Sequence, residues 1–249
     1  MTTPSARAMP STATPTGAVG LEARTSAESG GSPMLLVPLG SVEQHGPHLP
    51  LGTDNVIAGE VCRRVAPRLG PDWVLGPLIP FGCSGEHEGF AGTVSIGRAQ
   101  LVGYLVELVR SATRWTRGVR FVTGHGGNVP SLIEACGLLA SEGRDAAWTG
   151  MELAGADAHA GHTETSLMLR LRPGQVHHRA RERGRTDPVG DLMPRLREHG
   201  VAAVSPNGVL GDPTTATAAA GDDLFDRLCS TVQERLVQGR VGQGGRLVR

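Results

Sequence analysis

Apolar and polar positions follow two different patterns along this chain. Short, continuous apolar runs indicate buried strands, whereas apolar residues that recur every three or four positions indicate helices with one buried face. By this pattern we expect strands at residues 34–39, 73–79, 119–124 and 145–150. We expect helices at residues 55–69, 98–116, 128–143, 163–171 and 222–239. Strands and helices therefore alternate through most of the sequence.

This alternation is typical of β-α-β units, so it predicts an α/β fold: a three-layer αβα sandwich around a mainly parallel sheet. Residues 34–239 suffice for one such domain. Residues 1–33 are rich in Ala, Thr, Ser, Pro and Gly, and we expect them to form a disordered arm. We expect residues 240–249 to be a flexible tail. The Arg-, Gly- and Pro-rich segment 175–210 has no clear period.

Composition excludes several classes of function. The 24 basic and 24 acidic side chains balance, so the chain lacks the basic excess typical of nucleic-acid binders. No segment approaches the roughly 20 apolar residues of a membrane span, and we expect a cytoplasmic protein with no membrane partner. The chain contains no Lys, which excludes Schiff-base chemistry. Its four cysteines are widely spaced, as expected for free thiols in a reducing compartment.

Possible metal ligands gather directly after three of the predicted strands. They are Glu43, His45, His48 and Asp54 after the first, His125 after the third, and Asp157, His159, His162 and Glu164 after the fourth. Each segment alone is also compatible with an ordinary loop or helix start. Because parallel strands end at one edge of their sheet, the three segments together favour a single site there. Carboxylate and imidazole groups suit zinc, manganese or iron.

Four motifs together resemble the creatininase family of metal-dependent amidohydrolases. They are "PLGSVEQHGPHLPLGTD", "EHEGFAGTVS", "TGHGGN" and "HAGHTETS", and the resemblance spans roughly residues 34–172. It implies a creatininase-like fold that binds two divalent metal ions, zinc, iron or manganese, in each subunit. The ligands it implies are Glu43, His45, Asp54, His125 and Glu164, with Asp54 bridging both ions. Creatininase itself carries a glutamate after the Gly-His pair of the third motif, where this chain has Gly127.

The same resemblance implies roles for further residues. A metal-bound hydroxide would attack an amide carbonyl. His159 would serve as the acid/base, or alternatively would orient a metal ligand. Glu86, His87 and Phe90 lie in a polar loop that we expect to contact substrate. Family members also lead us to expect a homo-oligomer, by analogy a hexamer.

Two segments bear on the substrate. "CSGEHEGFAGTVSIG" and "AVSPNGVLGDPTTATAAAG" resemble the branch of the family that serves mycofactocin biosynthesis. That branch implies a peptidase that removes a modified C-terminal Val-Tyr dipeptide from a ribosomally made precursor peptide, a step towards a redox cofactor. Residues 175–210 would then either contact the peptide or form an exposed connection. Two alternatives stay open: an amidohydrolase acting on creatinine or a formamide, and a non-catalytic metal-binding scaffold of a biosynthetic complex.

Overall fold

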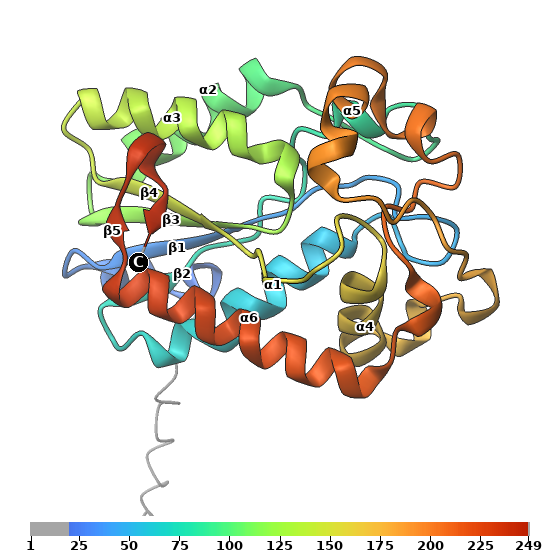
Figure 1. Ribbon diagram of the computed structural model, residues 1–249. Helices are drawn as coiled ribbons and strands as arrows, with labels where there is room; N and C mark the ends of the chain where they lie inside the picture. The colour runs from blue at the N-terminus through green and yellow to red at the C-terminus, as the bar shows by residue number, and fades with distance from the viewer. Residues whose placement is uncertain (1–19, 249) are drawn as a thin grey trace, which may run out of the picture.

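The computed structural model describes residues 20–248, and within them strands alternate with helices as the sequence predicts (Figure 1). The strands of the main sheet are β1 (Met34–Leu39), β2 (Trp73–Leu75), β3 (Gly118–Thr123) and β4 (Ala146–Gly150). The α-helices are α1 (Thr53–Val65), α2 (Arg98–Ala112), α3 (Val129–Ser141), α4 (His162–Leu171), α5 (Val189–Val204) and α6 (Ala218–Gln238).

The four strands form one parallel sheet in the order β2-β1-β3-β4. Every residue of β1 is buried, as expected for a parallel strand covered on both faces. Successive side chains point to opposite faces, so Leu36 belongs to the core beneath the sheet and Leu35 to the core above it. Helices α2 and α3 cover one face, while α1 and α6 cover the other (Figure 1). The predicted three-layer α/β fold is therefore confirmed.

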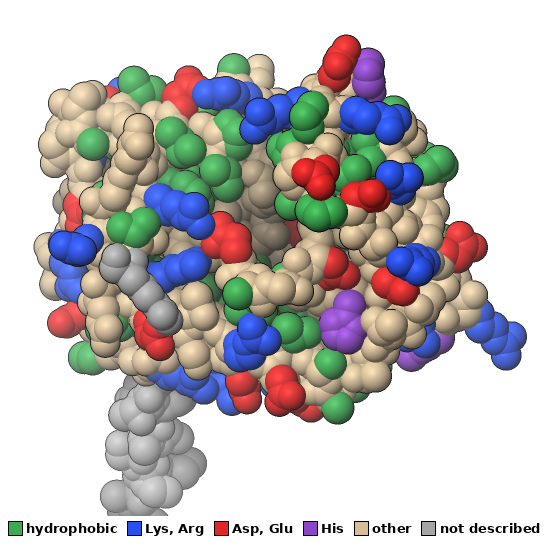
Figure 2. Space-filling view, viewed as in Figure 1, with side chains coloured by type: hydrophobic (Ala, Val, Ile, Leu, Met, Phe, Trp, Pro, Cys, Tyr) green, Lys and Arg blue, Asp and Glu red, His purple; other side chains and the backbone are tan. Residues whose placement is uncertain are grey.

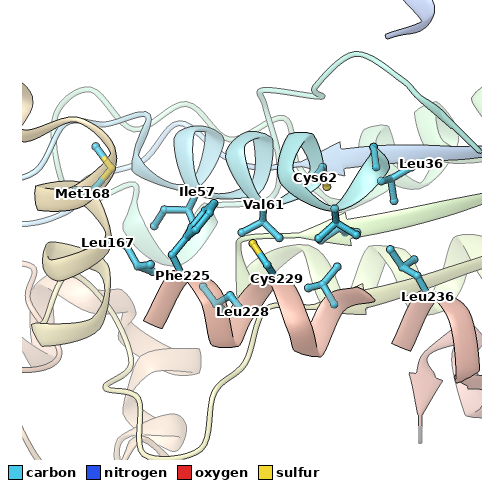
Figure 3. Packing of buried hydrophobic residues seen from close by; sticks show 14 of the residues in the cluster. Leu36, Ile57, Val61, Cys62, Leu167, Met168, Phe225, Leu228, Cys229 and Leu236 are labelled. Atoms are coloured by element: carbon cyan, nitrogen blue, oxygen red, sulfur yellow. The ribbon is translucent and has the colours of Figure 1, made fainter. Parts of the chain in front are cut away.

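The core beneath the sheet is built largely from helix-to-helix contacts. Val61 of α1 is fully buried, and Phe225 and Leu228 of α6 are 3% and 2% exposed. Figure 3 shows these side chains meeting between the two helices, with α4 closing one end of the cluster. This packing fixes the start of α1, which carries one of the candidate metal ligands.

Four element boundaries differ by four residues from the sequence-based prediction. Helix α1 ends at Val65 instead of residue 69, and α2 ends at Ala112 instead of residue 116. Strand β2 ends at Leu75 instead of residue 79, since Gly76 and Pro77 follow and proline lacks a backbone donor. Helix α6 begins at Ala218, four residues before the predicted start at 222. The hydroxyl of Thr217 accepts a hydrogen bond from the Ala220 N–H and caps the helix there.

The segment without clear periodicity, residues 175–210, contains helix α5. Pro194 lies inside this helix, and Gly200 has a non-helical backbone conformation with φ of 73°. The break at Gly200 divides α5 into a longer first piece and a short second one. Pro194 and Gly200 interrupt the helical pattern that would otherwise mark this segment in the sequence.

The two chain ends also differ in part from expectation. Residues 1–19 of the predicted arm lie outside the described residues, and residues 20–33 include two short 3₁₀ helices, Leu21–Ala23 and Ser26–Ser29. The expected flexible tail instead forms an antiparallel hairpin of β5 (Arg240–Val241) and β6 (Leu247–Val248). Glycines with positive φ allow its turn.

The surface agrees with the composition. Acidic and basic side chains are interspersed over the face shown in Figure 2, without a broad region of one sign. No helix among residues 20–248 is both long enough and apolar enough to cross a membrane.

Candidate metal centre

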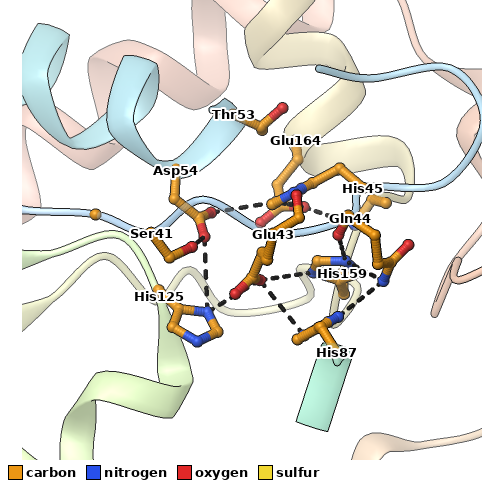
Figure 4. A network of polar contacts seen from close by, with 12 residues as sticks. Ser41, Glu43, Gln44, His45, Thr53, Asp54, His87, His125, His159 and Glu164 are labelled. Carbon is orange, nitrogen blue, oxygen red and sulfur yellow. Dashed lines mark hydrogen bonds and ion pairs between the residues drawn. The ribbon is translucent and has the colours of Figure 1, made fainter. Parts of the chain in front are cut away.

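The candidate ligands converge at the carboxyl edge of the sheet. Glu43 and His45 lie in the loop that follows β1, and Asp54 lies in the first turn of α1. His125 follows β3, and Glu164 lies in the first turn of α4, after β4. Figure 4 shows these five side chains pointing toward one another. The structure thus brings together all three strand ends that the sequence singles out.

One group of possible ligands forms around His125. Its Nδ1 lies 3.1 Å from Glu43 Oε1 and 3.6 Å from Asp54 Oδ2. The other ring nitrogen, Nε2, donates a hydrogen bond of 2.7 Å to the main-chain carbonyl of Cys83. Because that contact places the ring proton on Nε2, the lone pair of Nδ1 faces the two carboxylates. This is the orientation that a metal-binding imidazole needs.

A second group forms around His45 in the same way. The ring Nδ1 donates to the main-chain carbonyl of Glu43 over 3.1 Å. Nε2 then faces Asp54 Oδ1 at 3.3 Å and Glu164 Oε2 at 3.7 Å. Glu164 Oε2 also accepts a 2.6 Å hydrogen bond from the Ala160 N–H. Ala160 has a φ of 52°, a conformation uncommon for alanine, and it is this turn that presents the N–H to the carboxylate.

Asp54 connects the two groups. Its Oδ1 faces His45 and its Oδ2 faces His125, so each oxygen is available to a different ion. Ser41 Oγ donates a 2.5 Å hydrogen bond to Oδ2 and holds the carboxylate in this orientation. The side chain is 2% exposed. Asp54 is thus the carboxylate that both groups of possible ligands share.

The surroundings of Glu43 suit a cation. The residue is fully buried, and neither carboxylate oxygen has a hydrogen-bond partner among residues 20–248. Burial alone raises the pKa of Glu43, but His125, His87 and His45 outweigh that effect and hold the pKa well below its usual range. A buried carboxylate without hydrogen bonds is costly unless a cation compensates it. The donor set therefore fits divalent metal ions.

The negative charge of these carboxylates changes the pKa values of the imidazoles. Burial by itself lowers the pKa of His45 and of His125, yet the adjacent carboxylates raise both values to about 10. Asp54 is the largest such influence on His45, and Glu43 on His125. With these pKa values, both rings would carry a second proton at pH 7 when no metal ion is bound. Metal ions would displace these protons, as ligands must be deprotonated to bind.

His159, the expected acid/base, lies beside this centre. Its Nδ1 is 3.8 Å from Glu43 Oε1, and its ring centroid is 4.3 Å from that of His45. Burial, followed by the charges of His45 and His87, holds the pKa of His159 well below its usual range. The ring is therefore neutral at pH 7, as an acceptor of protons must be.

A family model for creatininase, described as creatinine amidohydrolase, matches residues 20–236. The chain belongs to the creatininase family. A mycofactocin precursor peptide peptidase of Mycolicibacterium smegmatis is 51% identical over 219 residues, covering 86% of this chain and 89% of the relative. The peptidase of the same name from Mycobacterium tuberculosis H37Rv is 50% identical over 215 residues, covering 83% and 86%. A creatinine amidohydrolase of Pseudomonas putida is 32% identical over 127 residues, covering 49% and 47%.

Solved structures of the family share the fold. A structure named "Creatininase Mn" has a TM-score of 0.73 and 24% sequence identity, and the match covers 87% of this chain and 96% of that one. Another, named "Crystal structure of creatinine amidohydrolase (creatininase)", has a TM-score of 0.74, 24% identity and coverage of 89% and 97%. The first of these names refers to manganese, and a further creatininase structure is described as "Zn-Zn type".

A cavity of about 830 Å³ opens onto the centre of this creatininase-family protein. His125 and His159 line it, together with Glu86 and His87 of the loop after β2. Its outer wall is α5, which contributes Val189, Met193, Leu196 and Arg197. Sequence reasoning placed no element in this wall, since the break at Gly200 hides the helical period. The centre therefore lies at the bottom of a pocket that has an apolar side.

Three large side chains lie outside the lining of this pocket. Phe90 does not line the cavity and packs instead on the apolar cluster of α5. His48 Nε2 pairs with the hydroxyl of Thr165 over 2.8 Å, which agrees with a structural role. Trp148 is 1% exposed in the core, and its indole N–H donates to Gly244 of the hairpin. Trp148 therefore lies outside the pocket lining.

Sequence reasoning missed two polar residues of the centre, Ser41, which holds Asp54, and Gln44. Gln44 is 5% exposed, and its amide contacts both His87 and His159. Its place inside the motif "SVEQHG" was the available signal, but an uncharged amide is not a metal ligand of the expected kind. Only the folded chain places this amide between the two imidazoles.

Proposed function

We propose that this protein is a metal-dependent peptidase that removes a modified C-terminal Val-Tyr dipeptide from the mycofactocin precursor peptide. The observation that carries the proposal is the 51% identity, over 86% of the chain, to a relative named mycofactocin precursor peptide peptidase. The buried centre supports it, because its donors are those of a hydrolytic metal site. The proposed substrate is inferred from the names of the relatives, and the proposed hydrolytic chemistry is inferred from the residues of the site.

Two metal positions follow from the proposed ligand set. Glu43, Asp54 and His125 would hold one ion. His45, Asp54 and Glu164 would hold the other. Divalent ions bound there would supply Lewis acidity and water of lowered pKa. Zinc, iron and manganese all suit these ligands.

The protein's own groups would handle binding and protons. The cavity is large enough for several residues of a peptide, and the apolar side chains of α5 would contact its side chains. The neutral His159 would take a proton from the attacking water and deliver it to the leaving amine nitrogen. Glu86 lies at the pocket wall, where burial raises its pKa. It would contact the peptide as a hydrogen-bonding group.

The test is incubation of the metal-loaded protein with precursor peptide already modified by its radical-SAM maturase. We expect mass spectrometry to show release of the dipeptide product, and His159→Ala with unchanged metal content should lose most of this activity. Intact precursor in the presence of full metal occupancy would sink the proposal and favour a scaffold. Turnover of creatinine in place of the peptide would favour the small-amide hydrolase.

The expected homo-oligomer is part of the same proposal, by analogy with the family. Light scattering coupled to gel filtration would measure the molar mass in solution. A mass of six chains of 25.9 kDa is the expected result, and a mass of one chain would contradict it.

A further inference from the structure

The side-chain amide of Gln44 is held in one orientation by two backbone groups. Its Oε1 accepts a 2.9 Å hydrogen bond from the Gly46 N–H, and its Nε2 donates to the Gly208 carbonyl over 3.0 Å. An N–H cannot accept and a carbonyl cannot donate, so these contacts distinguish the oxygen of the amide from its nitrogen. Gly208 packs so closely that a Cβ there would lie 1.9 Å from Gln44 Oε1. One hydrogen of Nε2 remains for another partner.

That remaining hydrogen decides where two histidines carry their protons. Gln44 Nε2 lies 2.8 Å from His87 Nδ1 and 3.0 Å from His159 Nε2. His159 Nε2 is also 2.8 Å from the main-chain carbonyl of Gln44, which can only accept. One assignment satisfies both 2.8 Å contacts and leaves only the longer 3.0 Å contact, between Gln44 Nε2 and His159 Nε2, as an approach of two donors. Gln44 donates to His87 Nδ1, and His159 Nε2 donates to the Gln44 carbonyl.

The two rings then present opposite groups to the metal centre. His87 carries its hydrogen on Nε2, which lies 3.4 Å from Glu43 Oε1. His159 has a bare Nδ1, which lies 3.8 Å from the same oxygen. The ring centroids are 4.5 Å apart, and the residues are 4% and 7% exposed. A donor and an acceptor therefore stand side by side, both largely shielded from water (Figure 4).

We propose that Gln44 is a positioning residue that holds His87 as a hydrogen-bond donor and His159 as an acceptor toward the reacting amide. The inference rests on the proposed peptidase function. The oxygen of water bonds to the carbonyl carbon, and His159 Nδ1 takes one proton from that water. The C–N bond breaks, and the same proton passes to the leaving nitrogen. His87 keeps its own proton and donates a hydrogen bond to the carbonyl oxygen as negative charge develops there.

This assignment also selects among the possible metal sites. Glu43, His87 and His159 have ligand atoms close enough to hold an ion. A nitrogen that carries a hydrogen has no lone pair for a metal. His87 is therefore excluded as a ligand through Nε2, the atom that faces the centre, so long as Gln44 occupies its Nδ1.

Long-range ¹H–¹⁵N spectra of protein labelled in its nine histidines test the assignment directly. The His87 signals are identified by their loss in His87→Gln. We expect the proton of His87 on Nε2 in both the metal-free and the zinc-loaded protein. A proton on Nδ1, or a His87 nitrogen that becomes metal-bound when zinc is added, would overturn the proposal. This readout does not depend on peptidase activity, so it stays informative even if the proposed function fails.

Gln44→Glu tests the positioning role. The carboxylate has no hydrogen to donate, so we expect the His87 proton to move to Nδ1 and kcat on the modified peptide to fall about 10²–10³-fold with KM changed little. Gln100→Glu adds the same charge at an exposed position and should leave kcat unchanged. A Gln44→Glu protein with the wild-type proton position and full kcat would refute the role. If that variant does not fold, His87→Gln, which retains an N–H donor, should keep more activity than His87→Phe, and equal losses would refute the donor.

Discussion

Replacing Asp54 by alanine should weaken both proposed metal positions at once. Asp54 Oδ1 lies 3.3 Å from His45 Nε2, and Oδ2 lies 3.6 Å from His125 Nδ1, so each oxygen serves a different group of ligands. Glu164 faces only His45 among these imidazoles, at 3.7 Å. Glu164→Gln is therefore the matched control, because it removes a ligand from one position and leaves the other intact.

The expected size of the effect follows from the energy of one ligand. Zinc binds to sites with four protein ligands with a free energy of about 10–16 kcal/mol. One ligand therefore contributes roughly 3 kcal/mol, which is about two orders of magnitude in Kd. Free metal at about ten times the wild-type Kd would fill about nine-tenths of an intact position and about one-tenth of a weakened one. We expect nearly two ions in the wild type, nearly one in Glu164→Gln and nearly none in Asp54→Ala.

Equilibrium dialysis against a buffered zinc solution, followed by elemental analysis of the protein, measures these occupancies. Far-ultraviolet circular dichroism should show that each variant is folded. One fully bound ion in Asp54→Ala would refute the bridging role, because a bridge cannot be removed from one position alone. Two bound ions would show that Asp54 is not a ligand at all.

Three further predictions concern the rest of the molecule. All four cysteines are buried, and burial raises the pKa of Cys229 to about 11. Ellman's reagent at pH 8 should therefore label few thiols in native protein and all four after denaturation, whereas rapid native labelling would contradict the packing. Phe225→Ala should lower the free energy of unfolding by about 3–5 kcal/mol in urea titrations. Val237→Ala, at a side chain 60% exposed, should change it by less than about 0.5 kcal/mol, and equal effects would contradict the core assignment. Deleting residues 240–249 should uncover Trp148 and shift tryptophan emission to longer wavelength, and an unshifted spectrum would contradict the hairpin contact.

The secondary structure could be predicted wherever one physical signal dominated. The apolar run 34–39 matches β1 residue for residue, because a parallel strand buried on both faces needs no polar position. Prediction failed where local and distant effects compete. Gly200 and Pro194 interrupt the period of α5, and the hairpin after α6 is placed by contacts with Trp148 of β4.

For the site, the sequence by itself determined the residue types and their grouping after strands. Parallel strands must end at a common edge, so Glu43, His125 and Glu164 could be expected near one another without coordinates. The five proposed ligands do converge there. The family could be recognised from the same motifs, and the match to its family model confirms it.

Only the tertiary structure decided which polar side chain turns inward and which nitrogen of a ring faces the centre. Asp157, of the same chemical type as Asp54, accepts the Thr163 N–H at the start of α4 instead of joining the ligands. Gln44 meets the carbonyl of Gly208, 164 residues away along the chain, and that contact orients its amide toward His87. Hydrogen bonds of this kind depend on loop conformations that distant segments impose, so no local pattern of residues encodes them.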